Sequence, residues 1–87
     1  MGKEEKMIAR LRMIPSDYTF QEAKSLAGRF GYRVNNKGST SGSRVMLVKD
    51  NSKERIFLHK PHPGDVMKEY AVRQFYEALI ENGDIDE

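Results

Sequence analysis

The chain contains no cysteine, which excludes a disulfide framework and a zinc site built on thiolates. It also has no apolar run near the roughly 20 residues that a membrane-spanning helix needs. Its first residues, MGKEEK, lead into an amphipathic stretch with neither the apolar block nor the small-residue cleavage site of a secretory signal. We therefore expect a soluble, cytoplasmic protein with no membrane partner.

The length of 87 residues allows one domain, spanning 1–87, with a modest hydrophobic core. No clear cluster of metal-ligating residue types stands out along the chain. The sequence therefore predicts a single-domain protein without a metal site or another cofactor.

The net charge of +2 conceals a separation of the two signs along the chain. Residues 24–60 hold nine Lys or Arg against two Asp or Glu, whereas residues 61–87 hold two against seven. A basic middle favours a polyanion as partner, because each phosphate that a cation neutralises releases condensed counterions. A solvated surface of mixed charge is the alternative interpretation.

Two helices are predicted in the first third of the chain. Apolar residues recur at helical spacing over residues 4–13 and stop at Pro15, which predicts a short first helix. Thr19 and Glu22 have the spacing of a capping box, in which each side chain accepts a hydrogen bond from the other's backbone N–H. The second helix therefore begins there, and Gly31 ends it because glycine accepts the left-handed conformation common after helices.

Three strands and a last helix follow. Tyr32–Asn35, Val45–Val48 and Arg55–Leu58 are β-compatible runs, and the turn composition of residues 50–53 joins the last two as an antiparallel hairpin. From Lys68 onward, apolar residues at helical spacing predict a third helix that Gly83 closes, with Ile85 packing back.

This order predicts an α+β, two-layer domain in which the two longer helices cover one face of a three-stranded antiparallel sheet. The α-β-β-β-α core has the element order of double-stranded-RNA-binding domains (dsRBDs), with an extra N-terminal helix. Five aromatic residues are predicted to belong to the core and not to a base-stacking surface: Tyr18, Phe20, Phe30, Phe57 and Phe75.

The run KGSTSGSR, from Lys37 to Arg44, joins the first two strands and has no apolar side chain. Two glycines, four hydroxyl groups and a cation at each end can offer many hydrogen bonds to a phosphate. The run therefore predicts a phosphate-binding loop. It is not a P-loop, because no lysine follows the second glycine and a strand, not a helix, comes next. A flexible connection without a ligand is the alternative.

The run HKPHPG, from His59 to Gly64, follows the third strand and holds both histidines of the chain. Imidazole exchanges protons near neutral pH, so His59 and His62 are candidates for general acid–base catalysis. Each has a plainer reading. His59 could be a half-buried residue bonded to a backbone carbonyl, and His62 could order the approach to the last helix.

Together these segments resemble the HicA toxins of HicA/HicB toxin–antitoxin pairs, over roughly residues 5–85. The matching segments are PSDYTF, the helix end at FGY, KGSTSGSR, HKPHPG and the end of the last helix at Asn82–Gly83. The resemblance implies a dsRBD-like fold, RNA binding with little sequence preference and metal-independent cleavage of messenger RNA. It also implies neutralisation by a HicB-type antitoxin.

One departure bears on the chemistry. Most members of this family carry Gly-Ser-His at the start of the middle strand, with the histidine as catalytic residue, whereas this chain has Gly42-Ser43-Arg44. His62 matches the histidine of the family's later Pro-x-His segment. We therefore expect His62 and His59 to be catalytic and Arg44 to stabilise the phosphate. The expected RNA- and phosphate-binding residues are Lys37, Ser39, Thr40, Ser41, Ser43, Arg44 and Lys60.

Two alternatives remain open at this point. A non-catalytic RNA-binding module of the same fold would keep the basic surface without turnover, and Arg44 in place of the family histidine favours it. A protein-interaction domain would direct the same basic loop at an acidic partner.

Overall fold

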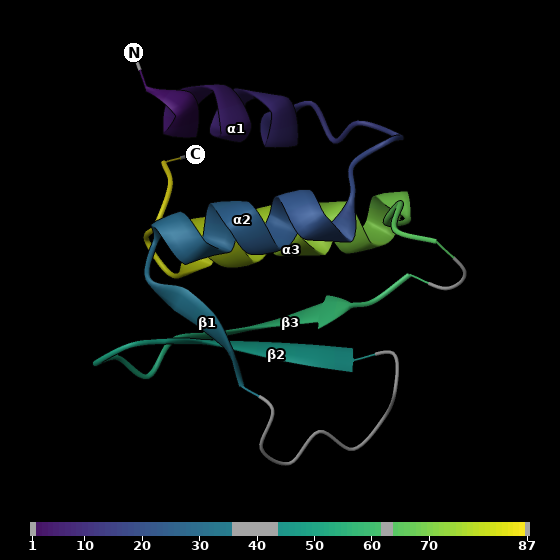
Figure 1. Ribbon diagram of the computed structural model, residues 1–87. Coiled ribbons are helices and arrows are strands. Elements are labelled where there is room, and N and C mark those ends of the chain that lie inside the picture. The colour runs from purple at the N-terminus through teal and green to yellow at the C-terminus, as the bar shows by residue number, and fades with distance from the viewer. Residues whose placement is uncertain (1, 36–43, 62–63, 87) are drawn as a thin grey trace.

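The computed structural model describes residues 2–35, 44–61 and 64–86. Its elements follow one another as α1 (Lys3–Arg12), α2 (Phe20–Arg29), β1 (Tyr32–Asn35), β2 (Arg44–Lys49), β3 (Arg55–His59) and α3 (Glu69–Glu81). This confirms the α+β class, the order of elements and the three-stranded antiparallel sheet. Helix α2 contacts β1 and helix α3 contacts β3, both on the same side of the sheet, and α1 lies on the far side of these two helices (Figure 1). No helix in the described ranges is both long and apolar enough to span a membrane.

The predicted ends of α2 are confirmed. The hydroxyl of Thr19 accepts a hydrogen bond from the Glu22 N–H at 3.1 Å, and the Glu22 carboxylate accepts one from the Thr19 N–H at 3.0 Å. After α2, Gly31 has a φ of +97°, a left-handed conformation that costs a residue with a Cβ atom more than it costs glycine. Both ends of α2 are therefore determined by neighbouring residues that can be identified in the sequence.

The sheet has the order β1-β2-β3, with both neighbouring pairs antiparallel. Leu47 on β2 lies between Val34 on β1 and Ile56 on β3. Because directly opposite residues point to the same face, these three side chains belong to the face that the helices cover. Leu47 and Ile56 are almost fully buried, whereas Val34, on an edge strand, is partly exposed.

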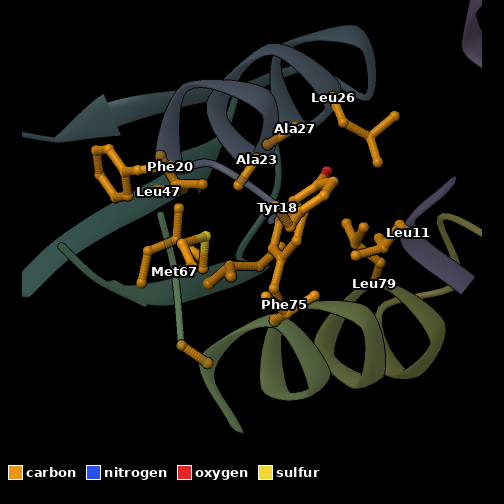
Figure 2. Packing of buried hydrophobic residues seen from close by; sticks show 14 of the residues in the cluster. Leu11, Tyr18, Phe20, Ala23, Leu26, Ala27, Leu47, Met67, Phe75 and Leu79 are labelled. Carbon is orange, nitrogen blue, oxygen red and sulfur yellow. The ribbon is translucent and has the colours of Figure 1, made fainter. Parts of the chain in front are cut away.

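The hydrophobic core fills the space between this sheet face and the helices (Figure 2). Tyr18 and Phe75 are its largest fully buried side chains, and burial raises the pKa of the Tyr18 phenol. The segment before α3 is tied to the start of α2, because the Met67 N–H donates to the Tyr18 carbonyl at 2.8 Å. Ile85 is also buried, which confirms that the residues after α3 pack back onto the core.

The prediction that all five aromatic residues are core residues is wrong for Phe57, which is 50% exposed. Tyr18, Phe20 and Phe75 are buried, and Phe30 is partly buried against the core. Phe57 stands between Ile56 and Leu58 on β3, which are both buried under the helices. Since side chains alternate along a strand, Phe57 points to the opposite face.

A polar cluster joins the sheet to the segment that follows α3. The Asp84 side chain, only 3% exposed, forms an ion pair with Lys49 of β2. The Tyr32 hydroxyl donates to the Asp84 carboxylate at 2.6 Å and accepts from the Asn82 amide at 2.9 Å. Burial, and then the hydrogen bond to Asp84, raise the pKa of Tyr32. Asp84, which belongs to the acidic C-terminal segment, therefore serves to join that segment to the sheet.

Candidate nucleic-acid interface

Three of the predicted site residues lie in the described part of the structure: Arg44, His59 and Lys60. Arg44 opens β2, His59 closes β3, and Lys60 follows directly and is exposed. The other predicted site residues lie outside the described residues, namely His62, Lys37, Ser39, Thr40, Ser41 and Ser43. The described part of the candidate site therefore consists of the start of β2 and the end of β3.

Arg44 and His59 are brought together by the sheet, although fifteen positions separate them in the sequence. They are direct partners across the antiparallel β2–β3 pair. Side chains at such positions leave the same face of the sheet, with Cβ atoms about 5 Å apart. Arg44 is exposed and His59 is half-buried. The Arg44 guanidinium lies over the Phe57 ring, whereas the His59 ring lies against Tyr70 of α3, so the two side chains start from paired positions at one end of the sheet and contact different neighbours.

His59 contacts a residue that the sequence interpretation did not assign to the site. Its ring centroid lies 5.9 Å from that of Tyr70, with an angle of 57° between the ring planes. Tyr70 is the second residue of α3 and is 51% exposed. The buried face of α3 is centred on Ala71 and Phe75, which are four residues apart. The offset of Tyr70 from this spacing is the signal that could have identified it.

The outer face of the sheet, which we define as the face away from α2 and α3, consists of three rows of side chains. No described helix lies over this face (Figure 1). Following the register, its rows are Arg33–Val48–Arg55, then Asn35–Met46–Phe57, then Arg44–His59. Each strand therefore contributes one arginine to the face, and the middle row contributes an exposed aromatic ring.

The arginines of the outer face differ in their contacts. Arg33 donates to the Asp50 carboxylate at 2.6 Å, in an exposed ion pair. Within the described residues, Arg44 and Arg55 contact uncharged groups instead. The Arg44 guanidinium carbon lies 4.9 Å from the centroid of the Phe57 ring, and the Arg55 guanidinium lies 3.9 Å from the Met46 sulfur. Two guanidinium groups are thus held on the face with their positive charge available to an anion.

This arrangement combines what binding of a polynucleotide requires. Guanidinium groups bind phosphate oxygens through planar, two-pronged hydrogen bonding. An exposed ring accepts a stacked base, and an imidazole beside a cation can move a proton near a phosphate. In the described ranges, no three His, Asp or Glu side chains gather in a group that could hold a metal ion.

Comparison of the chain with family models, with curated proteins and with solved structures finds no match in any of the three.

Proposed function

We propose that this chain is an RNA-binding endoribonuclease of the HicA toxin type, which cleaves messenger RNA without a metal ion. The observation that carries the proposal is the pairing of Arg44 with His59 at one end of an arginine-bearing sheet face that no described helix covers. The dsRBD-like order of helices and strands is consistent with the same proposal. The resemblance of the sequence to HicA toxins supplies the reaction type.

The reaction proposed is attack of a ribose 2′-oxygen on the adjacent phosphorus. The bond from phosphorus to the 5′-oxygen breaks, which leaves a 2′,3′-cyclic phosphate on one fragment and a 5′-hydroxyl on the other. A base takes the proton of the 2′-hydroxyl, and an acid protonates the departing 5′-oxygen. His59 serves one of these proton transfers and His62 the other, each contributing roughly 10²–10⁴-fold. Arg44 and Lys60 stabilise the additional negative charge on the phosphate.

This assignment accounts for the departure at position 44. In most members of the family the histidine of the middle strand carries the proton. Here the residue directly opposite position 44 on the neighbouring strand is itself a histidine, His59. In this chain the catalytic imidazole is therefore on β3 and not on β2, and Arg44 stabilises the negative charge of the phosphate.

The proposed partner follows from the same resemblance. A HicB-type antitoxin would neutralise the toxin in the cytoplasm, where messenger RNA is translated. Acidic groups on such a partner would complement the arginines of the outer face. Expression of the chain alone should arrest growth, and the product of a neighbouring gene should relieve the arrest.

The decisive experiment is incubation of the purified chain with messenger RNA in EDTA. We expect fragments with 2′,3′-cyclic phosphate ends, and no cleavage above background by His59→Ala. Recovery of intact RNA with the wild-type chain would overturn the nuclease proposal.

A non-catalytic RNA-binding module is the second candidate, and the identity of Arg44 favours it. It predicts that the chain binds RNA with a strong dependence on salt concentration and leaves the RNA intact. The EDTA experiment separates the two candidates directly.

A further inference from the structure

We infer that the outer face of the sheet binds an unpaired stretch of RNA, with one base stacked on the pair formed by Phe57 and Arg44. The inference rests on the proposed function for the nature of the ligand and adds a recognition surface to it. It specifies that the stretch of messenger RNA bound on this face is single-stranded.

The first argument is the position of Phe57. Phe57 is the middle residue of the edge strand β3 and is half exposed, whereas its neighbours in the chain on either side are buried. Leaving half of an aromatic side chain in water forgoes part of the stabilisation that full burial would provide. The ring is not isolated, because Arg44 lies over it at 4.9 Å and Met46 is its cross-strand partner.

The second argument is that both groups of this pair are planar. Both an aromatic ring and a guanidinium plane accept nucleobases by stacking, and such stacking tolerates any base. In an A-form duplex the bases already stack on one another and their faces are enclosed. A base can therefore reach Phe57 only when it is unpaired.

The third argument is charge. Arg33, Arg44 and Arg55 come from three different strands and all lie on the outer face. A second copy of the chain docked through the same face would bring these cations against their own counterparts, which is unfavourable. A phosphate chain crossing the strands meets Arg44 and Arg55, whose described contacts are uncharged, and then Arg33, which is paired with Asp50.

The fourth argument is the distance to the proposed chemistry. Phe57 and His59 are two positions apart on β3 and share the outer face. Two residues span about 7 Å along a strand. A base stacked on Phe57 would therefore hold a neighbouring phosphate beside His59 and Arg44, which places cleavage next to an unpaired base.

The test is fluorescence anisotropy of the full chain with a labelled, 2′-O-methylated oligoribonucleotide about 12 nucleotides long. This probe cannot be cleaved, because its 2′-oxygen carries no proton. Phe57→Ala should weaken binding by roughly 5- to 100-fold, and Phe57→Trp should restore it. Met13→Ala removes an even more exposed apolar side chain, outside the sheet, and should bind like the wild type. Circular dichroism checks that each variant is folded.

Salt titration distinguishes stacking from charge. Phe57→Ala should leave the slope of log K against log[salt] unchanged, whereas Arg44→Ala should reduce it by about one phosphate contact. Equal affinity of Phe57→Ala and the wild type would overturn the inference. So would stronger binding of a polyglutamate peptide than of the oligonucleotide, or Phe57-dependent binding of duplex RNA in preference to single strands.

Cleavage of unmodified RNA is measured separately, so the two proposals fail independently. Binding that depends on Phe57 together with intact RNA would sustain this inference and overturn the nuclease proposal. Cleavage together with binding that is indifferent to Phe57 would do the reverse.

Discussion

Arg44 and His59 are cross-strand partners at the end of the β2–β3 pair, so the guanidinium and the imidazole rise from the same face of the sheet. The β2–β3 register puts His59 across from the position at which most members of the resembled family carry a catalytic histidine. Neither residue alone distinguishes an enzyme from a binding module. Because they are paired, substitutions at these two positions can test whether the chain cleaves RNA or only binds it.

Exchange of the two residues tests this relationship. The double variant Arg44→His/His59→Arg keeps one imidazole and one guanidinium on the same pair of positions and should retain measurable RNA cleavage. His59→Arg alone leaves two cations and no imidazole there, and should lose at least about 100-fold in rate, the low end of general acid–base contributions. Rates are measured on a labelled RNA in EDTA. A double variant as inactive as His59→Arg would contradict the proposed shift of the imidazole.

The two phenylalanines Phe57 and Phe75 should respond in opposite ways to the same truncation. Phe75 is fully buried, so Phe75→Ala should cost about 3–5 kcal/mol of the free energy of unfolding. Phe57 is half exposed, so Phe57→Ala should change stability by less than about 1 kcal/mol. Urea denaturation of both variants measures this. Comparable losses would mean that Phe57 is a core residue.

The ion pair between Lys49 and Asp84 should contribute measurably to stability. Asp84→Asn removes the carboxylate that binds both Lys49 and the Tyr32 hydroxyl. The partly buried Lys49 ammonium group then keeps only the more distant Glu54 carboxylate, at 3.9 Å. We expect a loss of about 2 kcal/mol, seen as a lower melting temperature. Asp86→Asn, at an exposed position two residues later, is the control and should shift stability by less than about 0.5 kcal/mol.

Acid should weaken the junction of α1 and α2 through Glu22. Its hydrogen bond from Arg10, at 2.6 Å, holds the pKa of the Glu22 carboxyl below its ordinary value. A depressed pKa means that this contribution is complete above the pKa of the unfolded chain and is lost as pH falls through the folded value. This contribution to stability should begin to fall at about pH 5. The pair is partly exposed, so we expect less than about 1 kcal/mol.

The measurement is urea denaturation from about pH 7 down to pH 3. Glu22→Gln should flatten the acid side of the profile, and Glu77→Gln, at an exposed position of α3, is the matched surface control. An acid profile of Glu22→Gln identical to that of the wild type would refute the role of the Arg10–Glu22 pair.

Two glycines of the α2 region should give substitutions of opposite sign. Gly28 lies within α2 with nothing within 4 Å of an added Cβ atom, so Gly28→Ala should stabilise the fold by about 0.5–1 kcal/mol. Gly31 has a φ of +97°, so Gly31→Ala should destabilise it by about 1–2 kcal/mol through backbone strain. Thermal denaturation of the two variants tests this, and a stabilising Gly31→Ala would show that the turn adapts.

Much of the fold was predictable because its signals are local. The capping box at Thr19 and the glycine after α2 depend on residues within one helical turn, and the structure confirms both. The strand at Tyr32–Asn35 was predicted with the residues it has in the structure. Phe57 was misplaced, because a lone aromatic residue in a short apolar run does not reveal which face of the sheet it joins.

The amino-acid sequence by itself determined the order of helices and strands, the helix ends and the polarised charge, because each follows from the identity and spacing of neighbouring residues. Only the tertiary structure decided that Arg44 pairs with His59, that Tyr70 contacts His59, and that Phe57 and three arginines share the outer face. These relationships depend on strand register and on the face that the helices cover. A shift of one residue in register would reverse every side chain, and only packing of the whole core fixes it.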